Sequence, residues 1–225
     1  LITYSRQGGE EYARLGFDPR RVFLAPNAAV GRPVQPPPDR PEALVRPPAV
    51  LFVGRLQPRK RVDLLIRACA SLPAAVQPEL RIVGDGPAAA DLRRLAGAIY
   101  PRTAFLGDRR GADLDAQLAA ADLFVLPGTG GLALQQAMAS GLPVMAAEAD
   151  GTQADLVRPE NGWQLPGGDL PALAAALEGA LIDIPRLRRM GAASFRIVAE
   201  EINLEAMVRG FLCAVAYVTR PPAAG

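Results

Sequence analysis

The chain has 225 residues, enough for one large domain or for one domain with part of a second. Half of the residues are hydrophobic and 21% are charged, so the chain can bury a core and does not have the composition of a disordered protein. A net charge of +2 argues against a dedicated nucleic-acid or membrane-surface binder. Histidine is absent, which excludes a histidine base, a histidine metal ligand and a Ser-His-Asp triad.

The two cysteines, Cys69 and Cys213, lie far apart in apolar, helix-like patterns. Two buried thiols are typical of a reducing compartment, so we expect a cytoplasmic protein, and two cysteines alone cannot hold zinc. The sequence shows no run of about 18 or more apolar residues, the length that a membrane-spanning helix needs. No signal peptide is visible, and the start at Leu1 suggests a piece of a longer protein.

Residues 1–31 are predicted to form a short unit. Residues 2–5 and 22–25 have the apolar character of strands, and residues 10–15 that of a helix, which a glycine would close. We expect this unit to be the remnant of an N-terminal domain, together with the strand that leads out of it.

A proline-rich segment, residues 32–48, follows the first unit. It contains seven prolines, a density that is incompatible with a helix or a central strand. The composition therefore predicts a semi-rigid linker.

From residue 49 onward, short apolar runs alternate with amphipathic segments. The predicted strands are residues 50–53, 80–83, 103–106, 123–126 and 142–145. The predicted helices between them are residues 62–70, 88–96, 114–120 and 131–140. Short strands that are apolar on both faces and separated by helices indicate an α/β domain with a doubly wound parallel sheet, which we place at residues 49–200.

Three further helices are predicted at residues 170–182, 185–200 and 204–218, with the amphipathic spacing of a bundle that closes the domain. The last of them would form, with the tail, a C-terminal segment at residues 201–225. In a doubly wound sheet the ligand site lies at the carboxyl ends of the strands. Every predicted loop at that edge contains glycine, namely residues 54–60, 84–87, 107–111, 127–131 and 147–151.

The first of these loops combines a glycine with Arg55 and Lys60. A planar guanidinium and a point-like ammonium suit a diphosphate. The alternative is a basic helix start on a solvated surface, but cations there oppose the helix dipole.

The second loop, residues 84–89, fits the loose dinucleotide pattern G-x-G-x-x-G/A, with Asp108 as a possible ribose acid. The pattern does not lie in the first strand–helix–strand unit, where that motif belongs. A simpler interpretation makes Asp85 or Gly86 a helix cap and places Pro87 in the first helical turn.

The loop at residues 127–133 contains three glycines where a strand leads into a helix. Consecutive N–H groups at a helix N-terminus bind anions, which favours phosphate or sugar binding over a merely tight turn. No Lys-Ser/Thr pair follows, so the loop is not of the Walker type.

Two other charged patterns receive ordinary interpretations. Asp113 and Asp115 would face different sides of a helix, so a metal site is disfavoured; we expect Asp113 to cap a helix and Asp122 to start a strand. The basic runs at 59–61 and 109–110 lack the aromatic residues and net charge of a nucleic-acid binder.

Taken together, these segments resemble the C-terminal, nucleotide-sugar-binding half of retaining GT-B glycosyltransferases of family 4, the glycosyl transferase group 1. Val-Gly-Arg-Leu at 53–56 with Lys60 resembles the family's G-R-L-x-x-x-K, and residues 80–87 resemble L-x-I-V-G-D-G-P. Further matches lie at residues 25–27, 105–107, 121–127, 137–144 and 161–162. The resemblance implies a Rossmann-like domain that binds a UDP- or GDP-linked sugar.

The chain departs from the family in the glycine-rich loop. The family carries two glutamates separated by seven residues, and this chain has Gly128 and Gln136 at those positions. In the family the first glutamate contacts the donor sugar or assists at the reaction centre, and the second accepts hydrogen bonds from the ribose. Gly128 cannot do the first task, whereas the Gln136 amide oxygen can still accept. Arg61 also replaces the usual glycine after the lysine.

The resemblance implies a role for each of these residues. The diphosphate would be held by Arg55, Lys60 and the amides of Gly131, Leu132 and Ala133. The ribose would contact Gln136, the base would contact Gly107, Asp108 and Arg109, and the donor sugar would lie at the loop of Gly128, Thr129 and Gly130. No metal and no other cofactor would be needed, because the cationic and amide groups neutralise the diphosphate.

We therefore expect the donor half of a retaining, metal-independent glycosyltransferase, with catalysis completed by an N-terminal acceptor domain outside this sequence. That domain could also supply a peripheral membrane contact. Two alternatives remain: a catalytically silent nucleotide-sugar-binding partner, motivated by the two lost glutamates, and a dinucleotide-dependent oxidoreductase domain.

Overall fold

Six parallel strands form the central sheet of the computed structural model, which describes residues 1–130, 132–147 and 153–219. The strands are β3 (Ala49–Val53), β4 (Glu79–Val83), β5 (Thr103–Gly107), β6 (Leu123–Leu126), β7 (Val144–Ala147) and β8 (Gly162–Leu165), in the order β5-β4-β3-β6-β7-β8. Residues of β6 and β7 are buried throughout, as expected for a parallel sheet that is covered on both faces. The predicted doubly wound α/β fold is confirmed.

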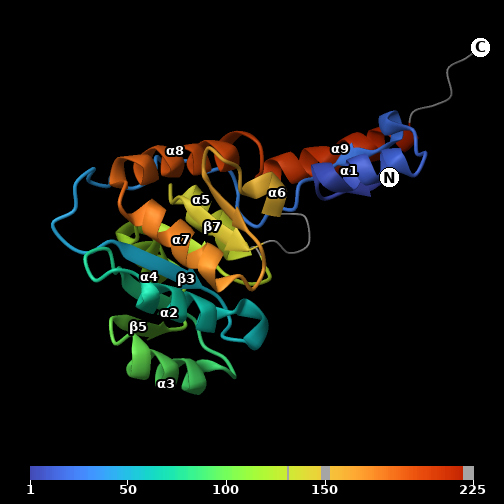
Figure 1. Cartoon of the computed structure of the whole chain (residues 1–225). Coiled ribbons are helices and arrows are strands. Elements are labelled where there is room, and N and C mark those ends of the chain that lie inside the picture. Colours follow the sequence, from blue (N-terminus) through green and yellow to red (C-terminus); the bar gives the residue numbers. More distant parts are fainter. Residues whose placement is uncertain (131, 148–152, 220–225) are drawn as a thin grey trace, which may run out of the picture.

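Helices cover the two faces of this sheet (Figure 1). One layer consists of α2 (Val62–Ser71), α3 (Ala89–Ile99) and α7 (Leu170–Leu181). The other contains α4 (Ala112–Ala120) and α5 (Leu132–Ala139), with α8 (Ile184–Glu200) packed on α5. The core between the layers includes fully buried Phe52 and Phe124, which adjoin the strand-order reversal between β3 and β6.

Two elements of the sheet region differ from the sequence expectation. Strand β7 begins at Val144 rather than at residue 142, because Leu142 donates its N–H to Ala137 O and is thereby held in the turn that follows α5. The short helix α6 (Gln153–Leu156) and the edge strand β8 were not predicted. The backbone of β8 approaches β7 so closely that a Cβ on Gly162 would fall within 3.0 Å of Val144 O.

The N-terminal residues form a separate small unit that consists of β1 (Ile2–Thr3), α1 (Arg6–Arg14), a 3₁₀ turn (Pro19–Arg21) and β2 (Phe23–Leu24). Helix α1 begins four residues before the predicted start because Ser5 accepts a hydrogen bond from Gly8 N at 3.0 Å and caps it.

Helix α9 (Leu204–Thr219) packs against this unit rather than closing a bundle with α7 and α8, so the expectation of one closing bundle was wrong (Figure 1). Gly210 permits the approach, since a Cβ there would meet the Leu24 carbonyl. Cys213 on α9 is exposed, so the expectation of two buried thiols was wrong for this residue, whereas burial raises the pKa of the Cys69 thiol to about 12.

By length and composition alone, the helical run Ile184–Thr219 could cross a membrane. Its most apolar window of 18 residues has a mean hydropathy of 1.3, and 22% of that window is buried. The run consists of two helices, α8 and α9, of 17 and 16 residues, joined at residues 201–203. Each is shorter than the about 20 residues that a spanning helix needs. We therefore do not assign this run as a membrane-spanning helix.

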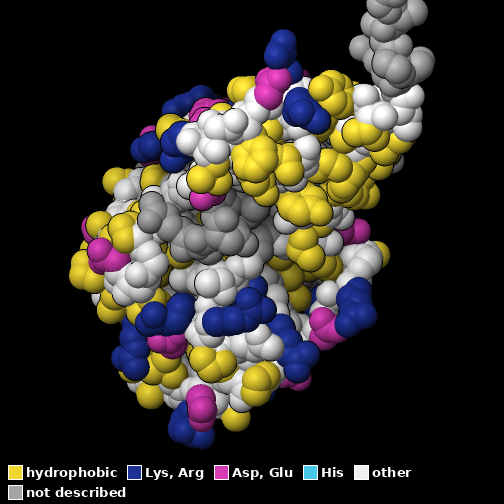
Figure 2. All heavy atoms as spheres, turned by 90° about the vertical axis from the view of Figure 1, so that its right-hand side faces the viewer, with side chains coloured by type: hydrophobic (Ala, Val, Ile, Leu, Met, Phe, Trp, Pro, Cys, Tyr) yellow, Lys and Arg dark blue, Asp and Glu magenta, His cyan; other side chains and the backbone are white. Residues whose placement is uncertain are grey.

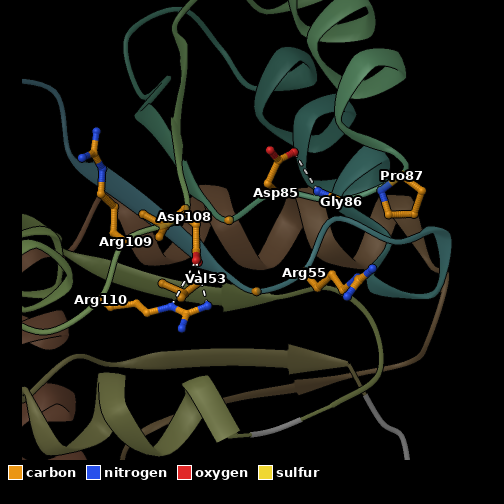
Figure 3. Close-up of a pocket in the computed structure, with 11 residues that line it drawn as sticks. Val53, Arg55, Asp85, Gly86, Pro87, Asp108, Arg109 and Arg110 are labelled. Carbon is orange, nitrogen blue, oxygen red and sulfur yellow. Dashed lines mark hydrogen bonds and ion pairs between the residues drawn. The ribbon is translucent and has the colours of Figure 1, made fainter.

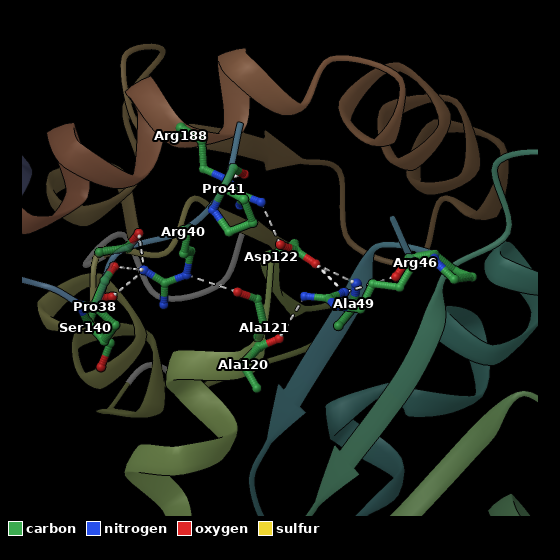
Figure 4. A network of polar contacts seen from close by, with 12 residues as sticks. Pro38, Arg40, Pro41, Arg46, Ala49, Ala120, Ala121, Asp122, Ser140 and Arg188 are labelled. Atoms are coloured by element: carbon green, nitrogen blue, oxygen red, sulfur yellow. Dashed lines mark hydrogen bonds and ion pairs between the residues drawn. The ribbon is translucent and has the colours of Figure 1, made fainter. Parts of the chain in front are cut away.

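The proline-rich segment, residues 32–48, is fastened to the domain by arginines, and we call it the strap (Figure 4). The Arg40 guanidinium donates to the carbonyls of Ala121, Leu118 and Ser140 at 3.0, 2.9 and 2.9 Å. Burial, together with a nearby arginine, lowers the pKa of Arg40 to about 10. The strap is thus held by side chains, a property that a semi-rigid linker would not have.

Asp122 joins the strap to the sheet and to α8. It is 1% exposed and pairs with Arg46 at 2.8 Å and with Arg188 at 2.7 Å, while its carboxylate also accepts from Ala49 N at 2.8 Å. Asp122 directly precedes β6, as expected, and its carboxylate provides the hydrogen-bond acceptor for the first N–H of β3.

Candidate functional site

A pocket of about 770 Å³ opens at the carboxyl ends of β3, β4 and β5 (Figure 3). Its walls come from three consecutive strand–helix loops. The lining residues are Val53, Gly54, Arg55, Val83, Gly84, Asp85, Gly86, Pro87, Asp108, Arg109 and Arg110. Three of the predicted site residues therefore surround one cavity: Arg55, Asp108 and Arg109.

The glycines of the second loop serve the packing of the loops on each other. A Cβ on Gly84 or Gly86 would fall within 3.0 Å of the backbone of Gly54 or Leu56. The two loops are also bonded, since Leu56 N donates to Asp85 O at 2.9 Å and Ala88 N donates to Leu56 O at 3.0 Å. The glycine pattern that fits a dinucleotide motif thus has a purely structural explanation.

The expected cap of the helix that follows this loop was wrong. Helix α3 begins at Ala89, with Ala88 at the cap position and no side-chain capping bond. The Asp85 carboxylate instead accepts from Gly86 N at 2.7 Å, and Pro87 precedes the helix. Asp85 is thus an acidic residue of the pocket lining (Figure 3).

The opposite side of the pocket carries a charged cluster on the loop after β5. Arg110 pairs with Asp108 at 3.0 Å, and Arg109 lies 3.9 Å from Asp113 on the first turn of α4. Asp113 does not cap α4, because Gly111 occupies the cap position, so that expectation was wrong. Gly107 ends β5 with φ +71° and its carbonyl accepts from Gly84 N at 2.8 Å, which fixes the loop against β4.

Lys60 lies further along the loop that carries Arg55, at the point where the strand order reverses between β3 and β6. Its Nζ donates to Thr129 O at 2.6 Å, and Thr129 N donates to Arg59 O at 3.1 Å. Burial, and secondly the neighbouring Arg59, lowers the pKa of the Lys60 ammonium below its usual 10.5. Ligands of doubly wound sheets bind in the crevice at such a reversal.

The glycine-rich loop after β6 lies directly on the first loop. A Cβ on Gly128 would fall within 3.0 Å of the backbone of Arg59 and Lys60, and a Cβ on Gly130, at φ +111°, would meet Lys60 Nζ. No side chain fits at position 128 without a shift of the backbone. The backbone of the first loop therefore occupies the space that a glutamate side chain at position 128 would need.

The predicted residues of α5 lie next to this contact. Leu132 and Gln136 are exposed and Ala133 is half-buried, whereas Gly131 lies outside the described residues. The loop expected at 147–151 also falls almost wholly outside them. The structure thus groups Lys60, Thr129 and the start of α5 at the reversal, and Arg55 with the loop after β5 around the pocket.

Sequence reasoning missed several residues of this region. Asp85 and Arg110 line the pocket, but the sequence analysis gave Asp85 only a capping role and gave Arg110 no role in ligand binding. Arg61 caps α2 with φ +52°, a left-handed conformation that explains why the family prefers glycine there. Gln135 looked like an ordinary helix position, yet it is 2% exposed and bonded to the chain near residue 28. Among the described residues, no group of three acidic or cysteine side chains could hold a metal ion.

The family described as "Glycosyl transferases group 1" matches residues 47–183. The chain is 41% identical to a GDP-mannose-dependent alpha-mannosyltransferase of Mycolicibacterium smegmatis over 156 residues, which are 67% of this chain and 38% of that protein. It is 34% identical to the D-inositol 3-phosphate glycosyltransferase of Salinispora tropica over 206 residues, or 80% of this chain and 43% of that protein.

Solved structures show the same fold. The Anabaena protein HepE in complex with UDP superposes with a TM-score of 0.76 at 20% identity, over 96% of this chain and 63% of that one. Sucrose-phosphate synthase from Thermosynechococcus elongatus superposes with a TM-score of 0.73 at 26% identity, over 97% and 58%. The chain spans less than half the length of the curated relatives it matches.

Proposed function

The chain belongs to the family of glycosyl transferases group 1, and from this premise we propose that it supplies the donor site of an enzyme that moves a sugar from a nucleoside diphosphate to an acceptor. The observation that carries the proposal is the contact of the two loops at the strand-order reversal, where Lys60 meets the glycine-rich loop, while Arg55 of the same first loop lines the 770 Å³ pocket.

In this proposal the diphosphate lies between the first loop and the start of α5. Arg55 and Lys60 provide the positive charge, and the backbone amides at Gly131, Leu132 and Ala133 donate hydrogen bonds to the phosphate oxygens. These groups also stabilise the charge that develops on the departing diphosphate, so the reaction needs no metal ion. Gln136 accepts a hydrogen bond from the ribose, and the loop of Gly128, Thr129 and Gly130 borders the sugar.

We propose GDP-mannose as the donor. Several relatives are named for their dependence on it, including the one that is 41% identical. The pocket wall at Asp108 and Arg109, which follow Gly107, has suitable chemistry, since an arginine can donate to guanine O6 and N7 and a carboxylate can accept from the guanine N–H groups. A UDP-linked sugar is the competing donor, and HepE was solved with UDP.

The acceptor would bind to an N-terminal domain that continues the first unit. A sheet of only two strands is marginal by itself, and β1 and β2 expose Ile2 and Leu24. Beside them an apolar hollow of about 460 Å³ is lined by residues of β1, β2 and α9, and hydrophobic side chains gather over this unit in Figure 2. We infer that further strands complete this sheet, and that a peripheral membrane contact, if the acceptor is a lipid, belongs to the same domain.

Retention of the anomeric configuration and a cytoplasmic location complete the proposal. Retention rests on the resemblance to the retaining group. The cytoplasmic location rests on two free cysteines, one of them exposed, which suit a reducing compartment.

A second candidate is a catalytically silent partner that binds the nucleotide sugar without turning it over. It is favoured by one observation: position 128 has no room for an acidic side chain, and position 136 carries a neutral amide.

Incubation of the full-length protein with GDP-mannose and candidate acceptors, followed by NMR of the product anomeric proton, tests the proposal. We expect an α-linked mannoside, since the donor is α-configured and the reaction retains. A β-linked product would contradict retention. Nucleotide binding without any transfer or donor hydrolysis would favour the silent partner, and transfer only from UDP-sugars would overturn the donor assignment.

A further inference from the structure

Gln135 connects the nucleotide domain to the segment that leads into the N-terminal unit. Its side chain is 2% exposed and projects from α5. Its Oε1 accepts from Ala29 N at 2.6 Å, and its Nε2 donates to Asn27 O. Among neutral side chains that reach this far, only a carboxamide offers one acceptor and one donor side by side. Gln135 therefore pairs with the backbone of this segment as a neighbouring strand would.

This contact lies where the chain passes from one unit to the other. We call residues 25–31 the connecting segment; it joins β2 to the strap, and Ala25 and Ala28 within it are buried. The second passage, into α9, runs beside it, since Leu204 N donates to Val30 O at 2.9 Å. A rotation of the N-terminal unit about these two passages would strain or break the bonds to Gln135.

The same helix carries the proposed donor contacts. Helix α5 begins at the glycine-rich loop, and the exposed Gln136 follows Gln135 directly. One helix thus carries both the bonds to the connecting segment and the residues of the proposed donor site. A third link between the units consists of the ion pairs of Glu201 with Arg6 at 2.8 Å and with Arg158 at 2.7 Å, and Asp155 of α6 also accepts from Arg6 N.

We propose that Gln135 is a positioning residue that fixes the orientation of the N-terminal unit relative to the donor site. In an enzyme whose acceptor is held by that unit, this orientation sets the distance between acceptor and donor sugar. The inference rests on the proposed function only for its effect on catalysis. Its structural part, a restraint on the orientation of the two units, does not depend on turnover.

The test compares full-length wild type with Gln135→Leu and Gln135→Glu. Leucine removes both bonds, whereas glutamate keeps the acceptor for Ala29 N and loses the donor to Asn27 O. Gln77→Leu is the matched control, because Gln77 donates to Leu72 O in the loop before β4, remote from the connecting segment. Variants that unfold are excluded by circular dichroism, and Gln135→Glu provides the milder change if Gln135→Leu does not fold.

The first readout is structural and independent of activity. Spin labels on the exposed Cys213 of α9 and on Arg94→Cys of α3 report the distance between the two units, while the buried Cys69 stays unlabelled. We expect one narrow distance distribution for wild type and Gln77→Leu, and a broadened or shifted one for Gln135→Leu, with Gln135→Glu between them. An unchanged distribution in Gln135→Leu would overturn the proposal.

The second readout separates positioning from donor binding. In Gln135→Leu we expect kcat for sugar transfer to fall about tenfold or more, because misplacement of reacting groups slows the chemical step. The Kd for GDP should stay within about twofold of wild type, since the donor contacts remain. A parallel loss of GDP binding, or an unchanged kcat despite a broadened distance distribution, would overturn the catalytic part. If wild type transfers no sugar, the proposed function fails, and the distance measurement alone decides the role of Gln135.

Discussion

Arg61 occupies a backbone conformation that suits glycine, and its replacement should stabilise the fold. Its φ of +52° costs a residue with a Cβ about 1 kcal/mol or more. The ion pair with Asp63 at 3.4 Å is half-exposed and contributes little in compensation. Arg61→Gly is therefore expected to raise the free energy of unfolding by about 1 kcal/mol in denaturant titrations.

Arg67→Gly is the matched control for this change, because Arg67 is exposed within α2, where glycine costs about 1 kcal/mol. Destabilisation by both substitutions would show that the left-handed backbone at 61 carries no strain.

Lys60 should make diphosphate binding sensitive to alkaline pH. Burial lowers its pKa below 10.5, so the ammonium loses its proton at a lower pH than an ordinary lysine. Only the protonated form attracts the diphosphate, so affinity should fall as pH rises through this pKa. In Lys60→Arg the guanidinium stays charged, and the same titration should show only the ionisation of the ligand itself, which is common to both proteins. Parallel pH profiles of the two proteins would exclude Lys60 as a phosphate ligand.

Gln136→Glu should tighten nucleotide binding by about 1 kcal/mol, because a carboxylate makes charge-assisted hydrogen bonds to the ribose hydroxyls. Repulsion from the diphosphate opposes this gain, and we expect attraction to dominate because Arg55 and Lys60 screen the phosphates. Calorimetry with the ribonucleotide and its 2′-deoxy and 3′-deoxy analogues gives the answer. Equal affinities for all three ligands in both proteins would mean that residue 136 does not contact the ribose.

Single residues differ in how far their positions could be predicted from the sequence. Arg55, Asp108 and Arg109 were predictable, because loops at the carboxyl edge of a parallel sheet converge and all three now line one pocket. Gln135 was not, because its partners are backbone groups more than 100 positions away, and no pattern within α5 reveals them. The need for glycine at 128 was also hidden, since it depends on the path of a distant loop.

At the scale of elements, the strap should contribute substantially to stability through Asp122. Asp122→Ala would leave Arg46 and Arg188 without their carboxylate and Ala49 N without its acceptor in a largely buried place. Breaking such a pair costs about 3–5 kcal/mol. Thermal unfolding of this variant should therefore begin at a clearly lower temperature than that of wild type.

Asp91→Ala provides the comparison, because its pair with Arg94 is more than three-quarters exposed on both sides. We expect a change within about 0.5 kcal/mol for that variant. Equal effects of the two substitutions would mean that the strap contacts do not stabilise the domain.

The elements of the sheet were largely predictable, and the exceptions have physical reasons. Strands β3 and β6 are continuous apolar runs, which is the pattern of buried parallel strands, whereas β4 contains Arg81 and β5 is only partly buried, yet both keep enough apolar residues to be recognised. Strand β8 has only one neighbour and a mixed burial pattern, so it lacks that signal. The packing of α9 on β1 and β2 follows from tertiary contacts, since an amphipathic pattern shows that a helix has an apolar face but not which partner covers it.

At the scale of the whole molecule, the chain divides the proposed chemistry between its two units. The parallel sheet carries the charged and glycine-rich loops of the proposed donor site. The two-stranded unit with α9 exposes apolar surface, on which we propose that the N-terminal domain packs (Figures 1 and 2). The chain passes from one unit to the other through the connecting segment and the strap, and it returns through the turn at residues 201–203. On the proposed function, transfer would require both units in one orientation, whereas nucleotide binding would require only the sheet and its loops.

Calorimetric titration of the protein with GDP, UDP and NAD, together with Arg55→Ala, Lys60→Ala and the exposed control Arg94→Ala, tests the donor site most directly. We expect one GDP site per chain, weaker binding of UDP and no binding of NAD. Each of the first two substitutions should weaken GDP binding by about 1.5–3 kcal/mol, the scale of hydrogen bonds to charged groups, while Arg94→Ala changes nothing. Binding of NAD in preference to both diphosphates, or GDP affinity that neither Arg55→Ala nor Lys60→Ala alters, would contradict a nucleotide-sugar site at these loops.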